Sequence, residues 1–258
     1  MSDKSSIEWT DATWNPVTGC TQIPGKVAGS GCDFCYAKKL LDTRQRANPK
    51  SARFGLPFET VLMHEDRLHQ PYTWSKPRRI FVNSLSDLFH ADVPAEFIFR
   101  VLTVMKNPSA QRHTFQVLTK RPERMRRIVQ SFVDECGVIP NLHLGVSVEN
   151  EQAAWRIEHL RKTPATVRWI SAEPLIGSLK NVALDGLDWV VLGGESGGPH
   201  VRPMRAEWAR DVRDRCATLG IPFLFKQWGS HDSDGFSTAK HLAGRELDGR
   251  THDEYPRA

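Results

Sequence analysis

The sequence lacks long apolar runs. None of its 258 residues falls in a stretch of about 18 consecutive apolar residues, the length that a membrane-spanning helix needs. The first sixteen residues also lack the apolar core of a signal peptide. We therefore predict a cytoplasmic protein with no membrane partner.

Cysteine is scarce, and charge of one sign is not in large excess. The five cysteines are odd in number, and three of them, Cys20, Cys32 and Cys35, lie within sixteen positions. This arrangement suits metal ligation in a reducing compartment better than a disulfide framework. The 35 Lys and Arg residues against 30 Asp and Glu give a net charge of +5. That balance fits an anionic partner without requiring one.

The three clustered cysteines form a candidate metal site. Cys32 and Cys35 are separated by two residues, so both thiolates can turn toward one ion, and the Gly/Pro-rich loop before them allows Cys20 to fold back. Three soft ligands can then converge on one point. A structural zinc site completed by a distant histidine, or a redox dithiol with Cys20 incidental, would use the same residues.

Short apolar runs alternate with amphipathic stretches along most of the chain. This alternation predicts right-handed βαβ units and a parallel sheet. The expected strands are residues 13–18, 60–64, 79–83, 114–118, 142–148, 167–171, 188–193 and 222–226. The expected helices are 37–46, 64–74, 94–105, 122–135, 151–160 and 206–219, with Trp155, Trp169, Cys136 and Cys216 expected to be buried.

We predict an α/β fold of the full or partial TIM-like (β/α) barrel type over residues 1–228. A doubly wound open sheet is the alternative. The polar, Gly/Asp-rich residues 229–258 are expected to form an irregular C-terminal extension. In a parallel barrel the residues that follow each strand share one mouth. Here they are rich in short polar and charged groups, at 83–87, 119–121, 147–150, 171–174, 194–198 and 226–228. Such a mouth could bind a zwitterion.

The residues around the third cysteine carry a family resemblance. Phe34 precedes Cys35, and Tyr36 and Ala37 follow it, so the segment resembles the radical S-adenosylmethionine (SAM) superfamily. The eleven residues between Cys20 and Cys32 depart from that superfamily's usual spacing of three. The resemblance implies a 4Fe-4S cluster held by Cys20, Cys32 and Cys35, with SAM on the fourth iron. It also implies an external electron donor of the flavodoxin or ferredoxin type and reductive cleavage of SAM to a 5'-deoxyadenosyl radical.

The strand tips supply the contacts that SAM would need. Lys120 or Arg121 would pair with its carboxylate, and Ser84, Ser86 or Asp87 would receive its amino group. Its ribose would meet Ser147, Glu149 or Asn150. Phe34, Glu173 and Glu195 are further candidate contacts. Gly194 and the residues to 198 could hold an anion with backbone donors or could form a turn with no ligand.

Two finer resemblances follow from the strand tips. Ser84 to Asp87 (Ser-x-x-Asp) and residues 118–120 (Leu-Thr-Lys) look like the spore photoproduct lyase-like branch. A cysteine is missing at the tip of the 79–83 strand, which argues against dimer repair. Residues 14–16, 87–90, 118–122 and 247–250 are similar to a phage-associated family of uncharacterised proteins, a resemblance that carries no activity.

Two functions of different class remain open from the sequence. One is a radical SAM enzyme acting on a nucleotide or nucleic acid, drawn in by Arg124, Arg126 and Arg127 at the start of the 122–135 helix. The other is a non-catalytic iron-sulfur or zinc module that binds nucleic acid through five basic residues, Lys120, Arg121, Arg124, Arg126 and Arg127. A solvated helix start explains these arginines equally well.

Overall fold

The computed structural model describes residues 5–23, 30–197 and 200–256. The chain divides into two compact units. The first comprises Met1–Gln22, Tyr36–Gly145 and Lys162–Thr166, and the second comprises Ile23–Cys35, Val146–Arg161 and Val167–Ala258. The tail predicted from residue 229 falls within the second unit, and its residues 257–258 lie outside the described ranges. In the described part of the chain, no helix is long and apolar enough to cross a membrane.

Three parallel strands form the core of the first unit. β1 (Ala12–Trp14) pairs with β4 (Arg79–Val82), and β4 pairs with β5 (Thr114–Thr119). The predicted strand 13–18 is split in two, because Pro16 has no N–H to donate to a ladder. Its second part, β2 (Val17–Thr18), instead pairs antiparallel with β3 (Leu62–Met63).

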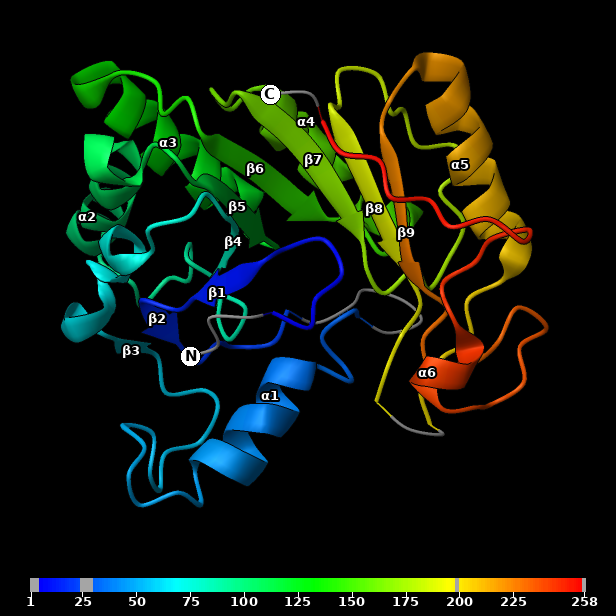
Figure 1. Cartoon of the computed structure of the whole chain (residues 1–258), viewed down its shortest axis with the longest axis horizontal. Coiled ribbons are helices and arrows are strands. Elements are labelled where there is room, and N and C mark those ends of the chain that lie inside the picture. Colours follow the sequence, from blue (N-terminus) through cyan, green and yellow to red (C-terminus); the bar gives the residue numbers. More distant parts are fainter. Residues whose placement is uncertain (1–4, 24–29, 198–199, 257–258) are drawn as a thin grey trace. The chain divides into compact units, whose positions relative to one another are not determined.

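Two long helices of the first unit lie side by side (Figure 1). α2 (Ala95–Lys106) and α3 (Pro122–Cys136) contact each other through Phe99 and Phe132, whose ring centroids are 5.3 Å apart. α1 (Tyr36–Leu40) continues as a single π-helical turn, η1 (Leu41–Gln45). The predicted helix 64–74 is wrong. Two 3-10 turns, η2 (Glu65–Arg67) and η3 (Gln70–Thr73), replace it, because Pro71 cannot continue an α-helix.

The second unit also has a parallel core. β7 (Val167–Ala172), β8 (Trp189–Gly193) and β9 (Phe223–Gln227) pair in that order, and the Trp169 and Trp189 ring centroids are 5.2 Å apart. α4 (Trp155–Arg161) and α5 (Ala206–Leu219) belong to this unit. Trp155, predicted as core, is 48% exposed because it begins α4 rather than facing inward. The tail carries one short helix, α6 (Lys240–Ala243), and Asp253 bridges to Leu224 of β9.

The strand order decides between the two predicted architectures. The described strands of the main sheet run β1-β4-β5-β6-β7-β8-β9, with β6 (Leu142–Ser147) beginning in the first unit and ending in the second. Each new strand is added on the same side of the previous one. In a doubly wound sheet, the side on which new strands are added changes at a switch point. No such change occurs in this order, which is that of a (β/α) barrel. The α/β prediction is confirmed, with seven strands described rather than the eight of a complete barrel.

Candidate functional site

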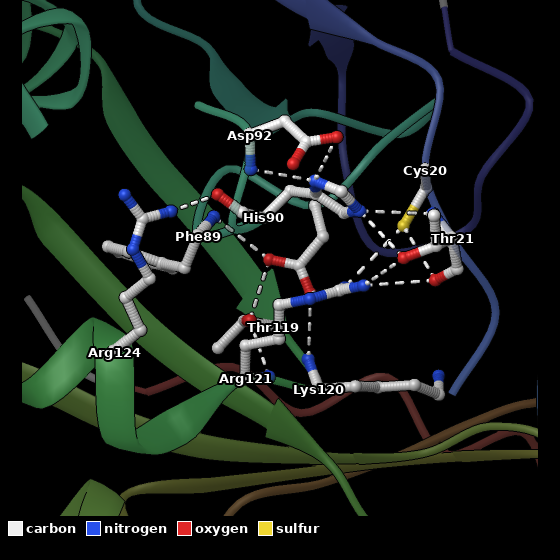
Figure 2. A network of polar contacts seen from close by, with 10 residues as sticks. Cys20, Thr21, Phe89, His90, Asp92, Thr119, Lys120, Arg121 and Arg124 are labelled. Carbon is white, nitrogen blue, oxygen red and sulfur yellow. Dashed lines mark hydrogen bonds and ion pairs between the residues drawn. The ribbon is translucent and has the colours of Figure 1, made fainter. Parts of the chain in front are cut away.

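Asp87 accepts hydrogen bonds from several residues at the strand ends of the first unit. Figure 2 shows this polar network, in which Thr119, Lys120 and Arg121 are labelled. Its Oδ1 accepts hydrogen bonds from Phe89 N at 3.0 Å and Thr119 Oγ1 at 2.7 Å. Its Oδ2 accepts from Lys120 N at 3.1 Å and from Arg121 Nη1 at 3.0 Å. The carboxylate is therefore saturated by groups from the ends of β4 and β5. The predicted contact of Asp87 with the SAM amino group stays a prediction.

Arg121 joins this carboxylate to the first cysteine. Its Nη1 also lies 3.5 Å from the Cys20 Sγ, while its Nη2 donates to Thr21 O at 2.9 Å and to Thr21 Oγ1 at 3.1 Å. Burial opposes the charge of Arg121, but Asp87 and Cys20 together raise the pKa of the guanidinium. A charged donor on the sulfur stabilises a thiolate over a thiol. Cys20 is thus held in surroundings that suit a metal-ligating cysteine.

His90 holds the residue that follows Cys20. Its Nε2 lies 2.7 Å from Thr21 Oγ1 and 3.2 Å from Thr21 N, and its Nδ1 meets Asp92 N at 3.1 Å. Burial, followed by the charge of Arg121, lowers the pKa of this histidine, so the ring is neutral at pH 7. Arg124 donates to the His90 carbonyl and to Val93 O at 2.6 Å. Arg124 is therefore engaged inside the unit and is not a free cation on the surface, as its place in a charge run had suggested.

Ser84 and Ser86 connect the ends of β1 and β4. Ser84 Oγ exchanges hydrogen bonds with the Asn15 side chain at 3.2 Å, and Ser86 Oγ donates to Val17 O at 2.9 Å. The Tyr36 hydroxyl donates to the Ser84 carbonyl. Both serines therefore support the segment that leads to Cys20, and their predicted contact with SAM is not tested by these bonds.

Arg53 was missed by sequence reasoning. It lies in a polar turn, yet only 1% of its surface is exposed. Its guanidinium donates to Thr60 O at 2.8 Å, Pro57 O at 2.6 Å and Thr18 Oγ1 at 3.2 Å. The same turn also holds the segment around Cys20, since Cys20 N donates to Phe58 O at 3.0 Å. Nothing in the local sequence distinguishes this arginine from a solvated one.

Gly19 leaves no room for a side chain beside that turn. Its φ is +88°, and a Cβ there would lie 2.0 Å from Thr60 O and 2.8 Å from Arg53 Nη1. The close approach of the two backbones therefore requires glycine at this position. It fixes the path of the chain directly before Cys20.

We expect His64 to make the stability of the segment before Cys20 dependent on pH. Its Nε2 lies 2.8 Å from Thr18 Oγ1, and burial, then the charge of Arg67, lowers its pKa from 6.5 to about 4. Between pH 6.5 and about 4, His64 is protonated in the unfolded chain but neutral in the folded chain. The free energy of unfolding should therefore fall as the pH falls. The loss from this residue should reach at most about 3 kcal/mol.

Urea denaturation at about pH 7, 5.5 and 4.5 measures this loss. His64→Gln keeps a polar side chain but cannot titrate, so its stability should depend less steeply on pH than that of the wild type. His241→Gln, at an exposed position, serves as the control. Equal pH dependence in the wild type and His64→Gln would refute the prediction.

The second unit holds the other two cysteines of the predicted site. Cys32 and Cys35 have intermediate exposure, and Phe34 between them is 42% exposed. Residues 24–29 of the long spacer lie outside the described ranges. In the described ranges, no group of three or more His, Cys, Asp or Glu residues is placed to hold a metal ion. The ligand set of Cys20, Cys32 and Cys35 therefore stays a prediction.

The predicted ribose contacts follow β6. Glu149, 3% exposed, forms a buried ion pair with Arg156 at 2.8 Å, and Arg156 also donates to Ser147 O at 2.8 Å. The Asn150 side chain accepts from Ala153 N at 3.2 Å and so begins the 3-10 turn η5 (Glu151–Ala153). These three residues have structural contacts of their own, and their role toward a ribose is untested.

Glu173 and Glu195 follow β7 and β8 in the same unit. Glu173 pairs with Lys226 at 2.7 Å and accepts from Ser171 Oγ at 3.2 Å. Glu195 is 5% exposed and binds the Arg202 guanidinium, with Oε2 at 2.9 Å from Nε and Oε1 at 2.5 Å from Nη2. Neither the Arg202 partner nor the Arg156 partner of Glu149 could be read from the sequence.

The glycine-rich loop after β8 packs closely on the end of β9. A Cβ on Gly194 would lie 1.8 Å from Trp228 O, and its N–H donates to Gln227 O at 2.9 Å. Gly197 N donates to Ser230 Oγ at 3.3 Å. These two N–H groups therefore bond within the protein. Gly198, included in the predicted donor run, lies outside the described residues.

The chain belongs to the family described as "Protein of unknown function (DUF5131)", whose model matches residues 4–256. No curated protein matches the sequence. A mutant of spore photoproduct lyase with one cysteine changed to serine is similar in structure at 12% identity and a TM-score of 0.48, over 84% of this chain and 64% of that one. Spore photoproduct lyase complexed with dinucleoside spore photoproduct is similar at 12% identity and a TM-score of 0.45, over 79% and 60%.

The chain spans less than two thirds of these lyases. The family description assigns no activity.

Proposed function

We propose that this chain is a radical SAM-type enzyme. Cys20, Cys32 and Cys35 would hold a 4Fe-4S cluster, because three thiolates leave one iron open for SAM. The observation that carries this proposal is the environment of Cys20, whose sulfur faces the Arg121 guanidinium 3.5 Å away at the end of the first unit's strands. When bound, the cluster would supply one electron, received from a flavodoxin- or ferredoxin-type donor, for reductive cleavage of SAM.

The residues of the chain would bind and orient SAM. Lys120 follows β5 directly, is half-buried, and could pair with the SAM carboxylate. The network around Asp87 would keep that segment in place, because the carboxylate accepts from the Lys120 N–H.

The test is SAM cleavage by the anaerobically reconstituted, dithionite-reduced protein. We expect 5'-deoxyadenosine to form and SAM to perturb the electron paramagnetic resonance spectrum of the reduced protein. Lys120→Ala should weaken SAM binding by about 1.5–3 kcal/mol, because a charge-assisted contact is lost. Lys76→Ala, at an exposed position before β4, is the control. An unchanged spectrum at saturating SAM, with no 5'-deoxyadenosine, would contradict the proposal.

We further propose that the substrate is a nucleotide or nucleic acid. Arg126 and Arg127 on α3 are exposed, and so are Arg44, Arg46 and Lys50 beyond α1, all in the first unit. Exposed guanidinium and ammonium groups attract phosphates. Arg124 donates to two carbonyls of its own unit, so Arg126 and Arg127 are the arginines at the start of α3 that we propose for phosphate binding.

Replacing Arg126 and Arg127 together with glutamine should lower affinity for single-stranded DNA or RNA. Two lost phosphate contacts should also reduce the slope of log affinity against log salt by about 1.4, at about 0.7 for each contact with a single strand. Lys76→Gln with Lys180→Gln removes two exposed charges elsewhere and should change neither quantity. If the wild type binds no nucleic acid or nucleotide at low salt, a small uncharged or zwitterionic substrate becomes the better proposal.

The competing function is a non-catalytic iron-sulfur or zinc module that binds nucleic acid. It would use the same thiols and the same surface arginines. Salt-dependent nucleic-acid binding without any effect of SAM would favour it. Stoichiometric zinc in protein made under anaerobic, iron-replete conditions would favour its zinc form.

A further inference from the structure

Arg202 contacts the Cys32 loop at three places within the second unit, where the Cys32 loop denotes residues 30–35. Its Nη2 donates to Ser30 O at 2.9 Å, and its Nη1 pairs with Asp33 Oδ2 at 3.2 Å. Its guanidinium carbon lies 5.5 Å from the centroid of the Phe34 ring. One side chain therefore reaches both ends of a turn that is separated from it by about 170 positions in the sequence.

Glu195 fixes the direction of that guanidinium. It receives the Arg202 backbone N–H and Nε, each at 2.9 Å, and Nη2 at 2.5 Å, so the fork is bound on one edge and faces the loop with the other. Glu195 itself is 5% exposed, and its backbone accepts from Ser230 N at 2.9 Å. The hydrogen bond to Glu195 is the largest cause that raises the pKa of Arg202. Such a bidentate pair leaves the arginine little freedom to turn away.

The loop is also shaped by its own hydrogen bonds and by Glu149. Asp33 Oδ2 accepts from Ser30 N at 2.8 Å, and Cys32 N donates to Ser30 Oγ at 3.1 Å. A Cβ on Gly31 would lie 2.6 Å from the Glu149 carboxylate, so the turn sits directly against the end of β6. The bonds of Arg202 join this local turn to the rest of the unit.

We infer that Arg202, oriented by Glu195, is a positioning residue that holds the Cys32 loop in one conformation. Glu195 then acts on the cysteines through Arg202 and the loop backbone. The consequence for cluster binding rests on the proposed function, whereas the holding of the loop does not. A loop held in one conformation presents Cys32 and Cys35 to a ligand without first paying the cost of ordering.

Hydrogen exchange by mass spectrometry on the full-length apoprotein tests this inference. Arg202→Gln should speed exchange at the Cys32 and Asp33 amides by about tenfold or more, because each bonds within the turn that Arg202 secures. Glu195→Gln should do the same to a smaller extent. Arg202→Lys should keep part of the protection, because a single ammonium nitrogen replaces the guanidinium fork. Arg205→Gln is the matched control, since Arg205 is 67% exposed and pairs with Glu207.

Two readouts separate this role from a general loss of stability. Exchange in β8 and β9 should stay at the wild-type rate in Arg202→Gln, while iron and sulfide taken up on reconstitution should fall at least severalfold. Unchanged exchange in the loop, or faster exchange throughout the unit, would overturn the inference. Faster loop exchange with full iron content would confirm that Arg202 holds the loop and would overturn the consequence for cluster binding. If the wild type takes up no iron, the proposed function fails, and the exchange result alone decides the role of Arg202.

Discussion

Replacing Cys32 with alanine should abolish iron binding. The wild-type protein, reconstituted anaerobically, is expected to hold about four irons and four sulfides per chain, since three thiolates suffice for a cluster with one open iron. With two thiolates left, the affinity should fall so far that gel filtration removes nearly all of the iron. Iron and sulfide assays together with the visible absorption spectrum measure the effect.

Cys136 and Cys216 lie outside the predicted cluster site, and Cys136 provides the control for this experiment. Cys136 is exposed, contrary to the prediction that it is buried, because it ends α3 at the surface. Cys216 is buried as predicted, and burial raises the pKa of its thiol to about 12. Cys136→Ala should leave the iron content unchanged. This result would show that the loss of iron in Cys32→Ala is not caused by the lower number of thiols alone. Stoichiometric zinc without iron or sulfide in the wild type would refute the cluster.

Asp87→Asn should destabilise the first unit by roughly 3–5 kcal/mol, the range for breaking a buried ion pair. The Asp87 and Arg121 side chains are 8% and 17% exposed. An asparagine has the same shape, but its NH2 group would face a donor in either orientation: the Lys120 N–H and the Arg121 guanidinium, or the Phe89 N–H. The charge on Arg121 would then lack its main partner.

Urea denaturation at pH 7 measures this loss, and Asp92→Asn is the control. Asp92 lies five residues further along and its side chain is 66% exposed, at 3.8 Å from the His90 ring. Because the Asp92 carboxylate is exposed and the His90 ring is neutral at pH 7, losing this charge should cost no more than about 1 kcal/mol. A loss in Asp87→Asn no larger than in Asp92→Asn would mean that the network is not a stabilising unit.

The parallel strands and long helices could be predicted from the sequence, because their signals are local. Buried apolar runs give β5, β7 and β8. The helix predicted at 206–219 is confirmed to the residue as α5, since its apolar period is regular and Gly220, with φ +67°, ends it. The prediction failed at 64–74, where Pro71 ends any α-helix. The helical stretch predicted at 37–46 is present, but the part after Leu40 is π-helical, which the sequence pattern did not indicate.

The polar site was predictable only as a set of residues near strand ends. Which of them bond to one another depends on partners far away in the chain. Asp87 and Arg121 are 34 positions apart, and Glu195 meets the loop through an arginine that lies next to no motif. The buried state of Arg53 depends on three backbone carbonyls and a hydroxyl. Every residue has a backbone carbonyl, so these partners could not be recognised from the sequence.

The partners of Arg53 bear on how the protein can be handled. Its guanidinium is surrounded by oxygen dipoles in a place that is 1% exposed, so dissolved ions cannot approach it. Exposed pairs such as Arg100 with Glu65 weaken as the ionic strength rises, whereas buried contacts are screened much less. Concentrated salt should therefore strip bound polyanions from the surface while the turn that carries Cys20 keeps its shape. A high-salt wash is then a safe first step in purification.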